Sequence, residues 1–175
     1  MKKYVVLLAV VFLVVPFAAA QEEQIDASTV NSYTPDPLPA AGTAFDLCFN
    51  VTVDSPDFEY MDRFEVDLPD GWTINTVTPP TRTGCSTADP VTGGTDAGNV
   101  VYWQGANYVP VTGSGCGAWS NGTYDFCANV TEPTYAGPYD FPWAIAGDVY
   151  GNPPHSTSGT ITGVVPVDLM SFDVE

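Results

Sequence analysis

The stretch FDLCFNVTV, residues 45–53, alternates apolar and polar residues at every second position. Successive side chains of a β-strand point to opposite faces, so this period predicts a strand with one buried face and one solvent face. A related phrase, YDFCANVT, begins at residue 124 and has the same alternation, again with a cysteine on the polar side. We interpret the two phrases as similar core strands from opposite sheets of one β-domain.

Shorter runs of the same kind predict further strands, and turn residues separate them. The chain has 16 glycines and 16 prolines, and no stretch shows the 3.6-residue apolar period of a helix. Residues 81–98, rich in Thr, Gly, Ser and Asp, are expected to form a long loop. About seven short antiparallel strands with these spacings predict an all-β sandwich. The other predicted strands lie at residues 64–68, 72–77, 99–104, 141–145 and 160–165.

The N-terminal residues predict export from the cell. Residues 1–20 combine two lysines, an apolar run and a final row of alanines, which is the pattern of a cleaved signal peptide. Residues 21–42 are polar and proline-rich, which favours an extended segment. The sandwich itself is predicted to span residues 43–165. We interpret residues 166–175 as a linker to a further module.

The chain is strongly acidic, with 21 Asp and Glu against 4 Lys and Arg and a formal net charge of −17. This charge repels nucleic acid and anionic lipid, so neither is an expected partner. After signal cleavage we expect no membrane insertion, because no later stretch is long and apolar enough. The acidity itself is explained either by solubility in a salty medium or by attraction of divalent cations.

Four cysteines in an exported chain predict two disulfides. Residues 120–123, Ser-Asn-Gly-Thr, have the sequence of a type I′ hairpin turn, and counting outward from it places Cys116 opposite Cys127. We therefore expect a Cys116–Cys127 disulfide, which leaves Cys48 to pair with Cys85. The repeated phrase suggests the alternative pairing of Cys48 with Cys127. That pairing conflicts with placing the two strands in opposite sheets, where their outward faces point apart.

Four carboxylates lie close together between the first two core strands. Because Ca²⁺ takes six to eight oxygen ligands, they form a candidate calcium site, although their spacing is not that of an EF-hand. Alternation along the strands favours a solvated acidic turn instead. Zinc is not expected, because the chain has one histidine and no Cys-x2-Cys pair. The four carboxylates are those of Asp54, Asp57, Glu59 and Asp62.

Aromatic rings are the second candidate site, since sugar-binding sandwiches stack pyranose rings on exposed aromatic faces. Tyr102 and Trp103 are adjacent in a predicted strand, so one of the two is expected to be exposed. Trp119 is predicted to face Tyr124 across the hairpin. Trp103, Trp119 and Tyr102 are therefore the candidate ligand-binding residues, with core filling as the alternative.

No catalytic group stands out in the sequence. The only histidine, His155, lies in a loop without a third member for a nucleophilic triad, and we interpret it as a surface residue. The acidic residues are so numerous that no single pair is favoured as the acid and base of a glycoside hydrolase. We therefore expect that the protein is not an enzyme.

The phrases FDLCFNVTVDSP, FEVDLPDGWTINTVTPP, NVVYWQG and SNGTYDFCANVT lie between residues 45 and 161. Together they resemble bacterial immunoglobulin-like repeat domains of secreted and cell-surface proteins. VVPVDLMSFDVE, residues 164–175, is similar to a linker phrase of type IX secretion cargo. These resemblances imply an immunoglobulin-like antiparallel sandwich that is secreted or displayed on a bacterial cell surface.

These observations lead to one expected function and two alternatives. We expect a structural or adhesive module whose partner is a protein or glycan at the cell surface. One alternative is a carbohydrate-binding module that uses exposed aromatics. The other is a subunit of a self-assembling extracellular fibre, in which the segment 21–42 adds a strand to a neighbour's open edge.

Overall fold

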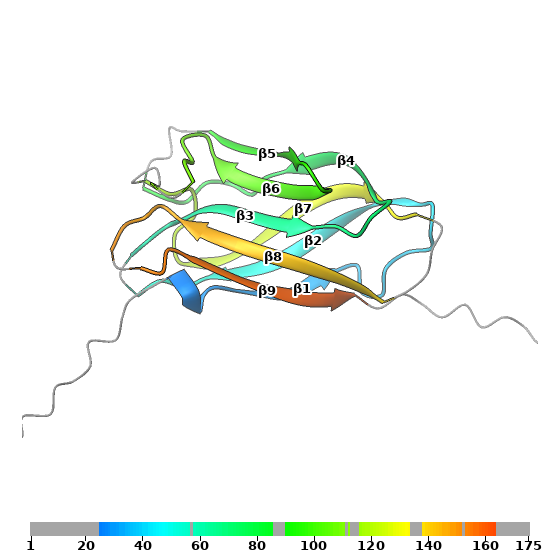
Figure 1. The fold of residues 1–175 in the computed structure, drawn as a ribbon, viewed down its shortest axis with the longest axis horizontal. Helices are drawn as coiled ribbons and strands as arrows, with labels where there is room; N and C mark the ends of the chain where they lie inside the picture. Colours follow the sequence, from blue (N-terminus) through cyan, green and yellow to red (C-terminus); the bar gives the residue numbers. More distant parts are fainter. Residues whose placement is uncertain are drawn as a thin grey trace, which may run out of the picture.

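The computed structural model describes residues 25–56, 58–85, 90–110, 112, 116–133, 138–151 and 153–163. Over these residues the chain is all-β apart from one short 3-10 helix, η1 (Ile25–Ala27), and contains no helix long and apolar enough to cross a membrane. Nine strands form two antiparallel sheets that stack face to face (Figure 1). The strands are β1 (Thr29–Thr34), β2 (Ala44–Val53), β3 (Met61–Asp67), β4 (Thr73–Thr78), β5 (Val91–Asp96), β6 (Val100–Gly105), β7 (Gly122–Thr131), β8 (Tyr139–Gly147) and β9 (Ser156–Gly163).

The strand order confirms the predicted fold class. One sheet has the order β1-β2-β7-β4 and the other β5-β6-β3-β8-β9. Strands β1-β2-β7-β4 facing β3-β8-β9 reproduce the ABED and CFG sheets of an immunoglobulin-like sandwich. Two strands exceed the expected number. β5 lies in the segment predicted to be a loop. Its sequence, VTGGTD, has a single large apolar residue, so no alternation indicates a strand there.

β1 is the other unexpected strand, and it lies within the segment predicted to be an extended tail. It pairs with β2, and a register shift between Val30 and Ser32 breaks its alternation, which hides it in the sequence. The sandwich therefore begins before residue 43. In this fold β1 occupies an edge of the protein's own four-stranded sheet.

An aromatic core lies between the sheets. The side chain of Trp103 is fully buried and stacks on Phe64 at 5.4 Å between ring centroids, with the planes 14° apart. Its indole Nε1 donates to the main-chain oxygens of Thr78 and Cys127, each at 3.2 Å. Because Trp103 belongs to the five-stranded sheet and both acceptors to the four-stranded sheet, this one side chain joins the two layers.

The two repeated phrases are neighbours in one sheet, which corrects their predicted placement in opposite sheets. β2 and β7 pair over their whole lengths, and Cys48 lies directly opposite Cys127. Their Cα atoms are 4.0 Å apart, close to the short spacing of a non-hydrogen-bonded antiparallel pair, and the two residues form a disulfide. The expected pairing of Cys48 with Cys85 is therefore wrong.

The predicted hairpin at Asn121-Gly122 is also absent, which explains the second disulfide. Residues 116–120 do not form a strand against β7. Trp119 is instead fully buried and bridges to Met61 of the other sheet through two backbone hydrogen bonds of 2.9 Å. Burial of this large ring outweighs the local turn preference. As a result, Cys116 does not lie opposite Cys127. It forms a disulfide with Cys85 instead.

Candidate functional site: the loop end

The described members of the predicted calcium site lie in different surroundings. Glu59 and Asp62 are buried, whereas Asp54 is exposed and Asp57 lies outside the described residues. A register shift between Met61 and its neighbours in β3 turns Asp62 inward. Across the part of the chain that the structure describes, no three His, Cys, Asp or Glu residues are grouped as a metal site.

The predicted aromatic ligand site is wrong for both tryptophans. Trp103 and Trp119 are fully buried in the core, because the inward face of the sandwich takes the larger rings. Tyr102 does face outward and is half-buried, but the guanidinium of Arg63 lies 4.3 Å from the centre of its ring. None of the three presents a free flat ring to a sugar.

One end of the sandwich gathers the long connections, and we call it the loop end. It lies at the left in Figure 1 and comprises the β2–β3, β4–β5, β6–β7 and β8–β9 loops. The Cys85–Cys116 disulfide joins the β4–β5 and β6–β7 loops. Long connections without regular structure are uncommon in compact domains and are often functional, which directs attention to this end.

Exposed apolar side chains also occur at the loop end. Phe58, Val109 and Tyr150 have exposed fractions of 73%, 48% and 60%, and they are the large hydrophobic residues that the described chain exposes. Each comes from a different loop. Their presence on three loops of one end makes this end the candidate interaction surface.

The backbone is strained at the same place. Phe58 and Val149 have φ angles of 67° and 66°, in the left-handed region that side-chain-bearing residues rarely adopt. The conformation is especially unfavourable for Val149 because its side chain is β-branched. Such strain persists only where surrounding contacts impose it, and it concentrates at binding sites and switches.

Buried carboxylates supply the contacts that impose this backbone. Glu59 Oε1 accepts from the backbone N–H of Val149 at 3.1 Å and lies 2.9 Å from Nδ1 of His155. Asp148 Oδ2 accepts from the N–H of Gly117 at 2.8 Å. These bonds tie the β2–β3 and β6–β7 loops to the β8–β9 loop, so the loop end is a preformed frame.

The Glu59–His155 pair was not expected from the sequence, which indicated a surface histidine. Burial of the Glu59 carboxyl raises its pKa from 4.5 to about 6, and the hydrogen bond from His155 opposes that rise. Gly147 is required here because a Cβ at that position would overlap the Glu59 carboxylate. The pair is separated by 96 positions in the chain, so no local motif marks it.

A pocket of about 290 Å³ opens between these loops. Its lining is mainly apolar and includes the polar residues His155 and Ser156. A smaller hollow of about 90 Å³ lies beside it on the outer face of the five-stranded sheet and shares three of its lining residues. We call the combined depression the loop-end groove. The pocket is lined by Tyr108, Val109, Pro110, Ala146, Gly147, Val149, His155 and Ser156.

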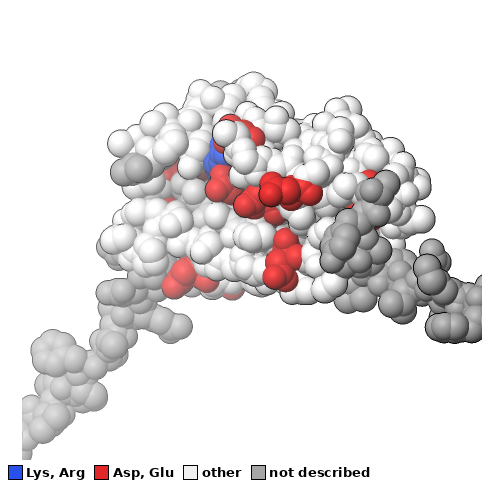
Figure 2. Space-filling model, turned by 45° about the vertical axis from the view of Figure 1, so that its right-hand side comes forward, with Lys and Arg blue, Asp and Glu red and all other residues white. Residues whose placement is uncertain are grey.

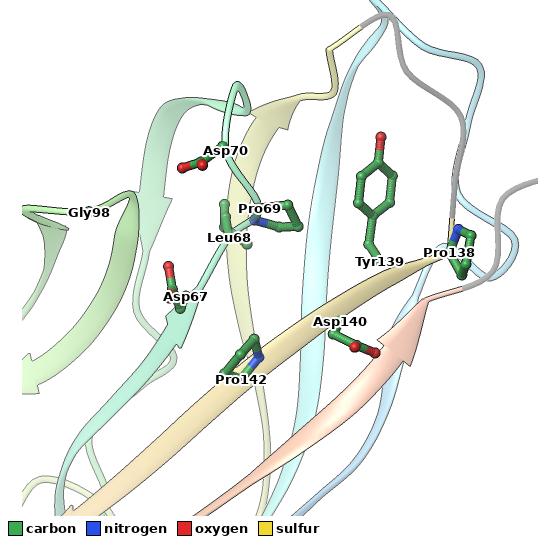
Figure 3. Close-up of a pocket in the computed structure, with 9 residues that line it drawn as sticks. All are labelled: Asp67, Leu68, Pro69, Asp70, Gly98, Pro138, Tyr139, Asp140 and Pro142. Atoms are coloured by element: carbon green, nitrogen blue, oxygen red, sulfur yellow. The ribbon is translucent and has the colours of Figure 1, made fainter.

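A larger pocket of about 410 Å³ lies at the opposite end of the sandwich (Figure 3). The exposed carboxylates of Asp67, Asp70 and Asp140 surround it, and its lining contains no basic residue. Figure 2, in which this end comes forward, shows acidic side chains gathered across the middle of the visible face and one small basic patch. This end is an open acidic surface rather than a shaped site.

Comparisons with known proteins support the fold. No protein-family model matches the chain, and no curated protein sequence is significantly similar to it. The structure is similar to part of the major pilin SpaD from Corynebacterium diphtheriae, with 13% identity, a TM-score of 0.54 and coverage of 77% of this chain. This chain spans only 35% of that pilin.

Two further similar structures have TM-scores below 0.5. One is a protein from Nocardia farcinica with an immunoglobulin-like fold, at 16% identity and a TM-score of 0.45, covering 75% of this chain and 96% of that one. The other is a cohesin module of a Clostridium perfringens family 33 glycoside hydrolase, at 12% identity and a TM-score of 0.47, covering 79% and 94%. At these identities the similarity concerns the fold alone.

Proposed function

We propose that this chain is a non-catalytic binding module of a secreted or cell-surface protein, and that it binds a protein partner through the loop end. The observation that carries the proposal is the set of three exposed apolar side chains, Phe58, Val109 and Tyr150, displayed by three different loops of the loop end. The two disulfides support an oxidising, extracellular setting.

The frame beneath these side chains supports binding over catalysis. Glu59 has no exposed surface, and its Oε1 is occupied by His155 and the Val149 N–H. A carboxylate held in this way fixes loop geometry. A preformed frame lowers the entropy that a partner's binding must overcome, which favours a specific docking surface.

Peptide selection tests the proposal. The protein from residue 21 onward, with both disulfides formed, is immobilised and used to select binders from a random displayed peptide library. We expect the selected peptides to lose at least tenfold in affinity when Phe58, Val109 and Tyr150 are replaced by Ala, because a few central apolar residues dominate interface energies. The melting temperature should change little, since all three side chains are exposed.

A matched variant carries three Ala substitutions on the sheet faces, at Thr34, Thr76 and Thr160, which are also exposed. It should retain the affinity of the unmodified protein. Selected peptides that bind the loop-end variant as tightly as the original protein would contradict the proposal.

A further inference from the structure

The loop-end groove extends from the apolar pocket onto the outer face of the five-stranded sheet. Its two parts share Tyr108, Ala146 and Ser156. The sheet face is hollowed there because β8 contributes the small side chains of Ala144 and Ala146. A depression of this form, with an apolar end and an open sheet-face end, fits two neighbouring side chains of an extended peptide.

Tyr108 forms one wall of the groove, and Arg63 packs against its ring. The Arg63 guanidinium lies 5.5 Å from the centre of the Tyr108 ring and 4.3 Å from that of Tyr102. It is fixed by Glu65 at 2.7 Å and Asp96 at 2.6 Å, and its own side chain is only 13% exposed. The groove is therefore shaped before any partner arrives.

The charge at the sheet-face end is negative. Arg63 is one cation that contacts two carboxylates. The side chains that carry them, Glu65 and Asp96, remain 37% and 54% exposed. Glu65 and Arg63 both line the groove, so the exposed Asp96 gives the cluster its excess negative charge. The other described arginine, Arg82, is buried beside Cys116 and Gly117. The chain as a whole has a formal charge of −17, which attracts cations from a distance.

We infer that the partner segment at this groove carries an apolar side chain next to a Lys or Arg side chain. The apolar group contacts Val109, Pro110 and Val149, and the cation lies near Glu65. This inference rests on the proposed binding function and specifies the partner's chemistry. The opposite chemistry, an apolar group beside a carboxylate, is disfavoured by like-charge repulsion.

Three capped dipeptides serve as probes: acetyl-Phe-Lys-amide, acetyl-Phe-Gln-amide and acetyl-Phe-Glu-amide. Each is titrated into the ¹⁵N-labelled protein from residue 21 onward at low salt, and amide shifts are followed at residues 108–109, 144–147 and 155–156. We expect the groove amides to shift, with affinity falling several-fold from the Lys to the Gln probe and again to the Glu probe. Added salt should reduce these ratios.

Glu65→Gln tests the charge directly. It should bring the Lys and Gln probes to nearly equal affinity. Asp67→Asn is the matched control, because Asp67 is exposed on the same strand two residues away and lines the pocket at the opposite end. It should leave the ratio unchanged. Melting curves of both variants establish that they are folded.

The outcomes separate the two proposals. Equal binding of the three probes in the groove overturns the charge inference and leaves the binding function standing. The absence of groove shifts with all three probes, or shifts confined to another surface, overturns the charge inference. If the peptides selected from the library also bind the loop-end variant as tightly as the original protein, the binding function is overturned as well.

Discussion

Asn31 of β1 and Asn75 of β4 occupy equivalent positions on either side of the Cys48–Cys127 disulfide. Each lies at the residue where its strand shifts register against its neighbour. Each side-chain amide donates two hydrogen bonds to the adjacent strand, one to an Asn and one to a Thr. The bonds join Asn31 to Asn50 (2.9 Å) and Thr52 (2.8 Å), and Asn75 to Asn129 (3.0 Å) and Thr131 (3.1 Å).

The equivalence extends across the four-stranded sheet. The amide of Asn50 donates to Asp125 at 2.7 Å, and the amide of Asn129 donates to Asp46 at 2.8 Å. β1, TVNSYT, also resembles β4, TINTVT. The sheet therefore consists of two similar strand pairs related by a local two-fold axis at the disulfide, and this arrangement gives the repeated phrase its structural meaning.

The first prediction follows from this two-fold relationship. Asn31→Ala and Asn75→Ala should each lower the free energy of unfolding by about 1 kcal/mol, and by equal amounts, because each removes the same two hydrogen bonds. Urea unfolding measures both values. Thr160→Ala, on the outer face of the other sheet, should change stability by less than about 0.5 kcal/mol. A difference above about 1 kcal/mol between the two Asn variants contradicts the equivalence.

The second prediction concerns the disulfides. In the chain-entropy description, replacing Cys48 and Cys127 by Ala should cost about 4.5 kcal/mol, because the bond closes a long loop. Replacing Cys85 and Cys116 by Ala should cost about 3.7 kcal/mol. Non-reducing peptide mapping should find a Cys48–Cys127 fragment. A Cys116–Cys127 fragment would restore the pairing that the hairpin signal favours.

The third prediction is a pH dependence of stability from Glu59. Its folded pKa of about 6 lies above its ordinary value of 4.5, so the folded state holds this proton more tightly than the unfolded state. Stability from this group is therefore fully present below pH 4.5 and lost as pH rises through 6, by about 2 kcal/mol in all. Urea unfolding across this range measures the decline.

Glu59→Gln provides the control for that decline. The amide keeps the shape of the side chain and a carbonyl oxygen that can accept from Val149, but it does not titrate. The variant should lose the fall in stability between pH 4.5 and 6, whereas Asp67→Asn should keep it. An identical pH profile for Glu59→Gln and the original protein would show that another group causes the decline.

The fourth prediction compares the stability cost of replacing two buried tryptophans. Trp103→Phe should destabilise the protein by about 1–3 kcal/mol, because the main-chain oxygens of Thr78 and Cys127 lose their shared donor. Trp72 is also buried, but its Nε1 has no hydrogen-bond partner among the described residues. Trp72→Phe should therefore cost clearly less. Equal losses in thermal or urea unfolding would rule out the sheet-joining role of Trp103.

Individual strands differ in how well the sequence predicts them. β2 and β7 carry uninterrupted alternation, and their faces are those expected. β1 escapes prediction because a bulge at Asn31 breaks its period, and β5 because Gly93 and Gly94 leave it almost without apolar side chains. The loop-end residues Phe58 and Tyr150 had only a weak sequence signal, namely an aromatic ring inside a polar loop.

The sequence by itself determined that the chain forms an all-β sandwich with Cys48 and Cys127 facing outward, because side-chain alternation is a local property of the backbone. Only the tertiary structure decided which strands are neighbours, which cysteines are bonded and that Glu59 meets His155. These depend on where large rings such as Trp119 find room in the core. That competition involves residues far apart in the chain, and no short stretch of sequence contains it.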